Sequence, residues 1–270
     1  MRLLILTKRS LLSIAFCLLI GILSATVAIS STVKAVQTAT TPREIPIYYV
    51  ETDKKQVALS FDAAWGNEQT EGLLDTLDKY NVKTTFFLVG EWVDKFPESV
   101  KEIAKRGHDV GNHSDTHCHM TQISTADMTG EIQSCNEKIK KLTNTTPTLF
   151  RAPYGDYNND VVNSVKGCDM YCVQWDVDSL DWKDPSAEQI TKNVVDKIQN
   201  GSIILLHNGA KNTPEALPMI IEGILDKGYE IVPISQILLK GEYYTDVQGK
   251  MCAKQADSTS QTAAHNILCK

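Results

Sequence analysis

The sequence predicts an α/β fold in which a parallel sheet forms a (β/α) barrel. Residues 45–239 alternate short apolar runs with amphipathic stretches, the pattern of repeated strand–helix units. No linker or change in composition interrupts this region, which indicates one domain. Polar side chains follow the apolar strands, and in a parallel barrel the carboxyl ends of all strands open on one face. We therefore expect these side chains to converge at one rim.

Hydrophobic periodicity orders the elements of this domain. The helix predicted over 124–142 is the clearest, because Ser124 provides a hydroxyl cap and Met128, Ile132 and Ile139 recur at helical spacing. The predicted strands are 45–50, 57–61, 83–89, 108–111, 148–151, 170–175, 203–206 and 230–232. The other predicted helices are 68–80, 97–105, 160–166, 186–199 and 214–227. The domain is expected to span 45–240, preceded by a linker over 36–44.

Composition and charge restrict the class of protein. The chain has 270 residues, of which 42% are hydrophobic and 22% charged, so it is long and apolar enough for one sizeable core. Four of its 27 basic residues and none of its 33 acidic residues fall in the first 35 positions, which leaves 23 basic against 33 acidic residues in the remainder. This surplus of negative charge argues against a nucleic-acid partner.

Residues 1–35 do not resemble part of the fold. A basic flank precedes an uncharged apolar run over 11–29, which is typical of an export signal or a membrane anchor. The run is long enough to span a bilayer, whereas the small residues Val33 and Ala35 suit a cleavage site, so both readings stay open, beside that of a buried core helix. The first two place the domain outside the cytoplasm, at the cell surface or anchored to the cytoplasmic membrane.

Export would expose the cysteines to an oxidising compartment. Six cysteines follow the first 35 residues and allow 15 pairings. Cys252 and Cys269 bracket much of a polar C-terminal tail, residues 241–270, and are the first pair we expect, because their bond would restrain that tail. Free thiols are the alternative. No CxxC spacing is present, which argues against a structural cysteine–zinc site.

The segment GNHSDTHCHM contains two histidines four residues apart, His113 and His117. Residues at this spacing can share one helical face or turn. Neutral imidazoles so arranged suit a divalent cation such as zinc, with a carboxylate from elsewhere completing the site. Taken alone, the spacing is also compatible with two ordinary surface or core histidines.

Five segments, in order, resemble the polysaccharide deacetylases of the NodB-homology, carbohydrate esterase family 4 type. They are VALSFD ending at Asp62, HSDTH over 113–117, RAPY over 151–154, DSLDW over 178–182 and LLH over 205–207. The resemblance covers roughly residues 56–239 and implies a distorted (β/α) barrel. The sequence DAAWG over 62–66, together with the N-terminal segment, is most similar to members of the sporulation-associated branch of the family in spore-forming Firmicutes.

The resemblance implies a role for each matching residue. Asp62 would be the base that takes a proton from water, and Arg151 would pair with that carboxylate. His207 would protonate the departing amine, oriented by Asp181.

Substrate contacts follow from the same motifs. The backbone N–H of Tyr154 would donate to the oxyanion, while Trp182 and Leu205 would line the acetyl pocket. His113 and His117 would bind the metal. Structural readings remain for single residues: Asp62 as a turn cap, Arg151 as a structural ion pair, Trp182 as core.

One departure from the family pattern concerns the metal. The family's first motif usually has two adjacent aspartates, the second a metal ligand, but here Asp62 is followed by Ala63. A methyl group cannot ligate a cation, so a divalent metal, zinc being the first choice, would lack a carboxylate. Three readings remain: Asp62 itself ligates, another group such as Asp115, Asp178, His119 or water fills the gap, or no metal binds.

Two hypotheses of function follow. In the first, the chain is an exported, metal-dependent deacetylase that removes N-acetyl groups from cell-wall glycan, either peptidoglycan or a chitin-like polymer, and is weakened by Ala63. In the second, it binds glycan in the same groove without turnover. Another amide or ester hydrolase on the same barrel is a third reading, because a fold does not determine its substrate.

Overall fold

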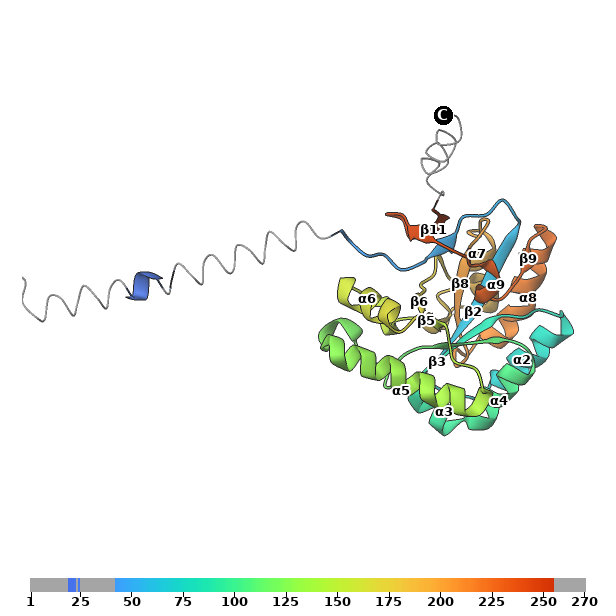
Figure 1. The fold of residues 1–270 in the computed structure, drawn as a ribbon. Helices are drawn as coiled ribbons and strands as arrows, with labels where there is room; N and C mark the ends of the chain where they lie inside the picture. The colour runs from blue at the N-terminus through green and yellow to red at the C-terminus, as the bar shows by residue number, and fades with distance from the viewer. Residues whose placement is uncertain (1–18, 23, 25–41, 255–270) are drawn as a thin grey trace, which may run out of the picture. The chain divides into compact units, whose positions relative to one another are not determined.

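The computed structural model describes residues 19–22, 24 and 42–254 (Figure 1). The chain divides after Arg43 into two units, and the domain described below is the second. In the first unit, residues 19–22 and 24 are helical. Most of the apolar run 11–29 lies outside the described residues, and none of the described helices is long and apolar enough to cross a bilayer.

The domain alternates strands and helices along most of its length. The strands are β1 (Tyr49–Val50), β2 (Gln56–Ala63), β3 (Thr85–Leu88), β4 (Asp109–Asn112), β5 (Leu149–Phe150), β6 (Tyr171–Cys172), β7 (Val177–Asp178), β8 (Ile203–His207), β9 (Glu230–Ile231), β10 (Tyr243–Thr245) and β11 (Lys250–Ala253). The helices are α2 (Thr70–Lys79), α3 (Gly90–Lys95), α4 (Pro97–Lys105), α5 (Thr125–Thr143), α6 (Asn159–Gly167), α7 (Ala187–Val195), α8 (Thr213–Asp226) and α9 (Ile234–Ile237). The helix predicted over 124–142 is confirmed as α5, and the Ser124 hydroxyl caps it by accepting from the Asp127 N–H.

The strands form a curled parallel sheet, which confirms the predicted parallel α/β architecture, and within the part of the chain that the structure describes the barrel is open on one side. The order is β6-β5-β4-β3-β2-β8-β7, with β9 paired to β2. The edge strands β6 and β7 do not pair, so the sheet is a half-barrel with helices around its outside (Figure 1).

The central strand β2 is buried on both faces and determines which side chains face inward. Val57, Leu59 and Phe61 pack into the cluster between the sheet and helices such as α2 and α8. The alternate residues Ser60 and Asp62 therefore point to the concave face. In register, Asp62 pairs with His207 of β8, so two polar residues 145 positions apart lie side by side.

The segment predicted as a polar tail is partly ordered into strands. β10 and β11 form an antiparallel pair, and β11 pairs in parallel with β1. Met251 is fully buried in the cluster around Ile47 and Phe87, which explains why this segment folds back onto the domain. Cys269 lies outside the described residues, so its pairing with Cys252 stays a prediction.

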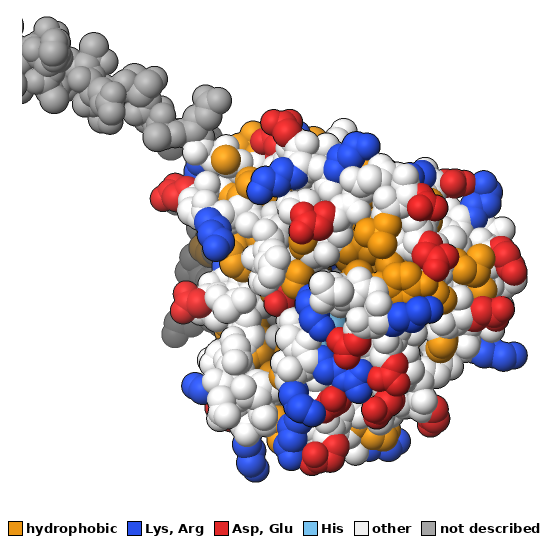
Figure 2. Space-filling model, turned by 90° about the vertical axis from the view of Figure 1, so that its right-hand side faces the viewer, with side chains coloured by type: hydrophobic (Ala, Val, Ile, Leu, Met, Phe, Trp, Pro, Cys, Tyr) orange, Lys and Arg blue, Asp and Glu red, His pale blue; other side chains and the backbone are white. Residues whose placement is uncertain are grey.

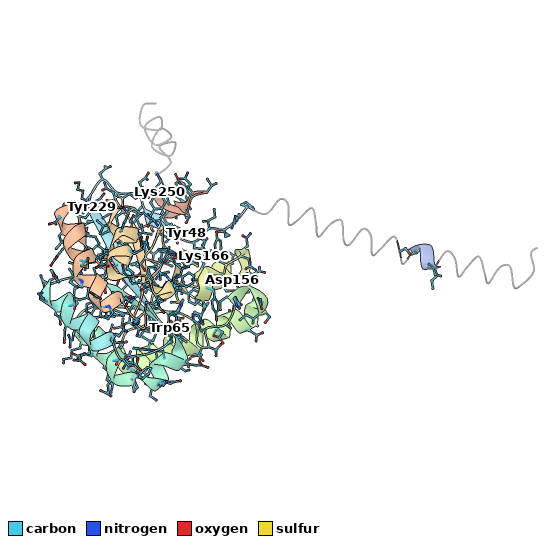
Figure 3. The ribbon with its side chains drawn as sticks, turned by 180° about the vertical axis from the view of Figure 1, so that it is seen from behind. Tyr48, Trp65, Asp156, Lys166, Tyr229 and Lys250 are labelled. Atoms are coloured by element: carbon cyan, nitrogen blue, oxygen red, sulfur yellow. The ribbon has the colours of Figure 1, made fainter. Side chains whose placement is uncertain are left out.

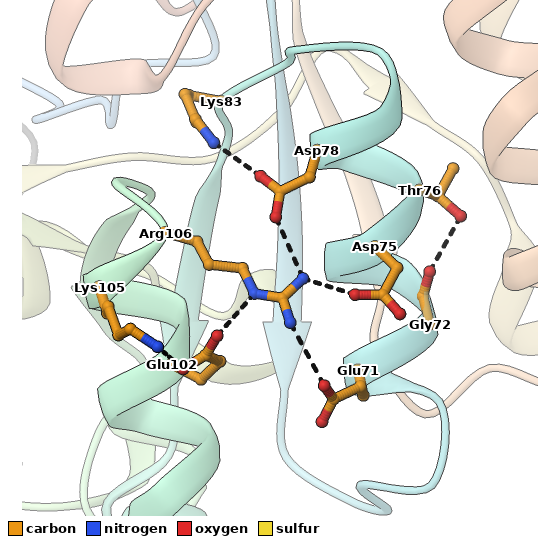
Figure 4. A network of polar contacts seen from close by, with 9 residues as sticks. All are labelled: Glu71, Gly72, Asp75, Thr76, Asp78, Lys83, Glu102, Lys105 and Arg106. Carbon is orange, nitrogen blue, oxygen red and sulfur yellow. Dashed lines mark hydrogen bonds and ion pairs between the residues drawn. The ribbon is translucent and has the colours of Figure 1, made fainter.

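A single arginine ties α2 to α4 on the outside of the domain (Figure 4). Arg106 contacts Glu71, Asp75, Asp78 and Glu102 at 2.6–3.3 Å, and the hydrogen bonds that it donates to Asp75 and Glu102 raise its pKa. The carboxylates are partly to largely exposed to solvent, so each ion pair contributes only modestly to the stability of the fold. Figure 2 shows a face on which basic and acidic side chains are interspersed, so neither sign forms a continuous surface there.

Candidate active site

A cavity of about 430 Å³ opens where the strands of the half-barrel end. It is lined by Asp62, Trp65, His113, His117, Tyr154, Trp175, Asp178, Trp182, Leu205 and His207. A second cavity of about 240 Å³, between α4, α5 and α9, contains none of the residues predicted from the motifs. The predicted convergence therefore occurs at the carboxyl ends of the strands, where parallel α/β sheets place their sites.

Asp62 and Arg151 form a buried ion pair beneath this cavity. Arg151 follows β5, is fully buried, and donates from Nη1 to Asp62 Oδ1 at 2.7 Å. Its Nη2 donates to Ser60 Oγ at 2.9 Å and to the Gln174 carbonyl at 3.1 Å. The guanidinium also lies 4.1 Å from the ring centroid of Phe87. These contacts hold the Asp62 carboxylate in one orientation.

The environment keeps Asp62 ionised. Burial by itself would raise the pKa of this carboxyl, but the positive charge of Arg151, with smaller effects from His113 and His207, holds the pKa below its ordinary value of 3.8. Oδ1 is occupied by Arg151, whereas Oδ2 faces His113 Nε2 at 3.5 Å. One carboxylate oxygen is thus directed toward the histidines of the cavity.

His113 and His117 converge, although not as a helical turn. Ser114 and His117 adopt left-handed backbone angles, with φ of 65° and 58°, and the His117 N–H donates to Ser114 Oγ at 2.9 Å. This loop brings the two imidazole centroids to 5.0 Å. Of the two arrangements expected for this spacing, one helical face or one turn, the structure shows the turn.

Both imidazoles are held neutral. Burial lowers the pKa of His113, and together with the neighbouring His113 it lowers the pKa of His117 to about 4. His113 Nδ1 lies 2.8 Å from the Arg151 carbonyl oxygen, which can only accept, so Nδ1 carries the proton. The Nε2 lone pair of His113 therefore faces Asp62, which is the tautomer required of a metal ligand.

The donor set is nevertheless incomplete for a resident divalent metal. Within residues 19–22, 24 and 42–254, no group of three His, Cys, Asp or Glu side chains is arranged to hold a cation. Ala63 is fully buried in the apolar cluster that also contains Leu88, and it does not line the cavity. A catalytic zinc site needs three protein ligands, and here the third would have to be Asp62, whose carboxylate is already held by Arg151. We therefore assign no step to a metal.

The other groups considered as replacement ligands are engaged elsewhere or lie at the rim. Asp115 accepts from Lys138 at 2.7 Å and from Ser134 at 2.9 Å, both on α5. His119 stacks on Tyr154, with ring centroids 4.1 Å apart. Asp178 does line the cavity, and one of its oxygens accepts from the Leu180 N–H.

His207 and Asp181 form a second buried pair, opposite Arg151. His207 Nδ1 lies 2.7 Å from Asp181 Oδ1, and the His207 N–H donates to Asp181 Oδ2 at 2.8 Å. Thr213 Oγ1 also donates to Oδ2, at 2.7 Å. Burial alone would lower the pKa of His207, but the hydrogen bond and charge of Asp181 raise it above its ordinary value of 6.5. His207 is thus suited to donate a proton.

Replacing Asp181 by asparagine should move the pH dependence of any reaction that needs the His207 imidazolium. Loss of the carboxylate removes the interaction that raises the pKa of His207, so the alkaline limb of the pH–rate profile shifts to lower pH. At neutral pH we expect activity to fall at least about tenfold. Thr213→Val, which keeps the bond to Nδ1, should shift the limb less. An unshifted limb in Asp181→Asn would contradict this assignment.

The three predicted substrate contacts lie around the mouth of the cavity. Tyr154 adopts φ of 61° between Pro153 and Gly155, and the residue is 61% exposed. No partner hydrogen-bonds the Tyr154 N–H among the described residues. Trp182 is 50% exposed, so its reading as a core residue is wrong, and Leu205 lines the floor from β8.

Comparison with known proteins agrees with this geometry. The family model "Polysaccharide deacetylase" matches residues 49–173. A peptidoglycan-N-acetylglucosamine deacetylase of Bacillus cereus is 36% identical over 186 residues, which are 67% of this chain and 68% of that protein. The chain belongs to the polysaccharide deacetylase family.

Two further relatives bear on activity within the polysaccharide deacetylase family. The uncharacterized protein YlxY of Bacillus subtilis is 37% identical over 72% of this chain, which spans only 60% of that protein. The crystal structure of a family 4 carbohydrate esterase pseudoenzyme from Bacillus anthracis is 35% identical, with a TM-score of 0.69 over 71% of this chain and 68% of that one. A mutant of that pseudoenzyme has restored enzymatic activity.

Some residues of the cavity were not predicted as site residues. Trp65 stacks on His207, and Trp175 lies with its ring centroid 5.5 Å from the Arg151 guanidinium. Both follow strands by two or three residues, which is a weak signal in sequence. Ser60, which lies within VALSFD, and Thr213 were given no role from the sequence, because their partners Arg151 and Asp181 are distant in the chain.

Proposed function

We propose that the chain is an exported deacetylase that removes N-acetyl groups from cell-wall glycan, with turnover weakened by Ala63. The observation that carries this proposal is the pair of opposed ion pairs at one cavity, Asp62 with Arg151 and His207 with Asp181. One side chain is poised to accept a proton and the other to donate one. Amide hydrolysis requires both transfers.

The reaction can be assigned to the chain's own residues. Asp62 would take a proton from a water molecule as that water attacks the acetamide carbonyl. The backbone N–H of Tyr154 would donate to the resulting oxyanion. His207 would then protonate the departing amine as the carbon–nitrogen bond breaks, which yields acetate and a free amino sugar. Leu205 and Trp182 would enclose the acetyl methyl group.

The choice of peptidoglycan as substrate is supported by relatives named as peptidoglycan deacetylases, among them that of Bacillus cereus. Because the chain spans 60% of YlxY and 40% of a second relative, the muramic acid deacetylase PdaC of Bacillus subtilis, their whole-protein properties are carried over here only as a proposal. Export and a cell-surface or membrane-anchored location rest on the sequence of residues 1–35. Membership of the sporulation-associated branch rests on the DAAWG sequence over 62–66.

Binding of glycan without turnover is the second candidate. It is favoured by Ala63 and by the likeness to a family pseudoenzyme. In this case the exposed aromatic rings of Tyr154 and Trp182 would still hold a sugar chain at the cavity.

An acetate-release assay, combined with elemental analysis and glycan binding, separates the two candidates. The purified chain, free of chelator, is incubated with acetylated peptidoglycan strands and with chitooligosaccharides, with and without added zinc. A deacetylase releases acetate from at least one of them, and His207→Ala abolishes that release. Binding of a glycan with no acetate release would establish the second candidate. Neither binding nor release would reject both.

A further inference from the structure

No role was predicted for Trp65 from the sequence, although its side chain lies against His207, the proposed acid. Trp65 follows β2 by two residues, and its indole stacks on the His207 imidazole with centroids 5.2 Å apart and planes inclined by 29°. The side chain is 46% exposed and lines the cavity. Figure 3 shows Trp65 on the side of the domain away from Lys250 of β11.

The backbone around Trp65 is held in place by several contacts. Gly66 adopts φ of 66°, and its carbonyl accepts from Trp92 Nε1 at 2.7 Å and from Asn208 Nδ2 at 3.4 Å. A Cβ atom at Gly209 would lie 2.4 Å from the Trp65 carbonyl oxygen and 2.8 Å from its ring. The loops after β2 and β8 therefore fit together only because residue 209 lacks a side chain. These backbone contacts therefore hold the indole of Trp65 in one position.

The hydrogen bond to Asp181 does not by itself fix the plane of the His207 ring. Its bond to Asp181 fixes Nδ1, but a ring held at one atom can still tilt about that point. An aromatic face lying against the imidazole restricts the ring plane as well, so that Nε2 keeps one direction into the cavity. A proton donor acts efficiently only when its reacting atom is held within a fraction of an ångström of its place.

We propose that Trp65 is a positioning residue that fixes the plane of the His207 imidazole and thereby aims its Nε2 at the nitrogen of the departing amino sugar. The role of Trp65 in protonating the amine rests on the proposed function. The stacking of Trp65 on His207 does not depend on it. This gives a role to the tryptophan of the DAAWG segment. The roles that the motifs predict for Asp62 and His207 do not account for that tryptophan. Trp65 acts through His207 and is not itself a catalytic residue.

The test compares Trp65→Leu with Trp65→Phe. Leucine keeps apolar bulk but loses the flat aromatic face, whereas phenylalanine retains it. Kinetics are measured on the native chain or on Ala63→Asp, whichever releases acetate. For Trp65→Leu we expect kcat to fall about tenfold or more, with KM changed by less than about threefold, because only the proton transfer is impaired. Phenylalanine should restore kcat to within about threefold of the parent.

A second measurement does not depend on turnover. Diethyl pyrocarbonate modifies accessible imidazoles, and peptide mass spectrometry reports the rate at each histidine. His207 should react several-fold faster in Trp65→Leu than in the parent, but at the parent rate in Trp65→Phe. Tyr244→Leu is the matched control, because Tyr244 is 50% exposed and lies on β10, outside the cavity. It should change neither measurement.

The outcomes separate this proposal from the proposed function. If no acetate is released by any variant while His207 modification rises only in Trp65→Leu, deacetylation fails but the positioning of His207 stands. An unchanged His207 modification rate in Trp65→Leu would overturn the proposal. A raised KM with unchanged kcat would also overturn it, because Trp65 would then be a substrate contact. Equal damage by leucine and phenylalanine would show a merely structural role.

Discussion

Replacing Ala63 by aspartate is expected to raise zinc-dependent acetate release by about 100-fold or more, since a metal that polarises the amide and activates water lowers the barrier by several kcal/mol. Ala63 pairs in register with Leu88, which in turn pairs with Asn112, the residue before His113. The neighbouring Asp62 already lies 3.5 Å from His113 Nε2, so position 63 is one residue from the histidine site, and an aspartate there would have to turn from the apolar cluster toward the cavity. It would supply the third protein ligand that the described cavity lacks.

The same change has a second expected effect that does not require turnover. Ala63 is fully buried among apolar side chains, so an aspartate without a cation should destabilise the domain by roughly 3–5 kcal/mol. Added zinc should reverse much of this loss, because a ligand that binds only the folded state stabilises it. Thermal unfolding with and without zinc measures the effect, and elemental analysis should find about one equivalent bound.

The double variant Ala63→Asp with His113→Ala is the control for both effects. It should lose the gain in acetate release and the stabilisation by zinc, because the imidazole is removed. If Ala63→Asp neither binds zinc nor gains activity, while the native chain binds glycan without turnover, the glycan-binding candidate is favoured. A gain that survives His113→Ala would contradict the assignment of His113 as a ligand.

Asp62→Asn is expected to have the largest negative effect on the native site. Loss of the base should lower turnover by roughly 10²–10⁴-fold. The amide cannot balance the charge of Arg151, which is fully buried, so the folded state should lose roughly 3–5 kcal/mol. Acetate release and thermal unfolding measure the two effects separately.

The double variant Asp62→Asn with Arg151→Met distinguishes catalysis from stability. Removing the unpaired cation should recover much of the lost stability, because apolar replacements of buried ion pairs are often neutral. Turnover should stay low. Full activity in Asp62→Asn would exclude Asp62 as the base, whatever its effect on folding.

The pH dependence of stability follows from the same ion pair. The pKa of Asp62 is lower in the folded state than its ordinary 3.8, so its contribution to stability is fully present above that value. It is lost as pH falls through the lower, folded-state pKa. The difference in unfolding free energy between native protein and Asp62→Asn should therefore shrink in acid, below about pH 4.

Much of the site was predictable because its residues follow strands. Asp62, Arg151 and His207 come at or directly after apolar runs, and parallel strands bring such positions to one rim. His113 and His117 were recognisable by their spacing, although a loop, not a helix, brings them together. The metal site was not predictable, because whether two imidazoles and one carboxylate suffice depends on distances that spacing does not contain.

The sequence by itself determined much of the local structure: α5 with its Ser124 cap, the order of most strands and helices but not α3, β7 and α9, and the polar residues at strand ends. These features depend on neighbours a few positions apart. Only the tertiary structure decided that the sheet stays open between β6 and β7, that β10 and β11 fold back onto β1, and that Trp65 stacks on His207. Each of these depends on contacts between segments far apart in the chain, and such contacts are determined by strand register and packing rather than by local pattern.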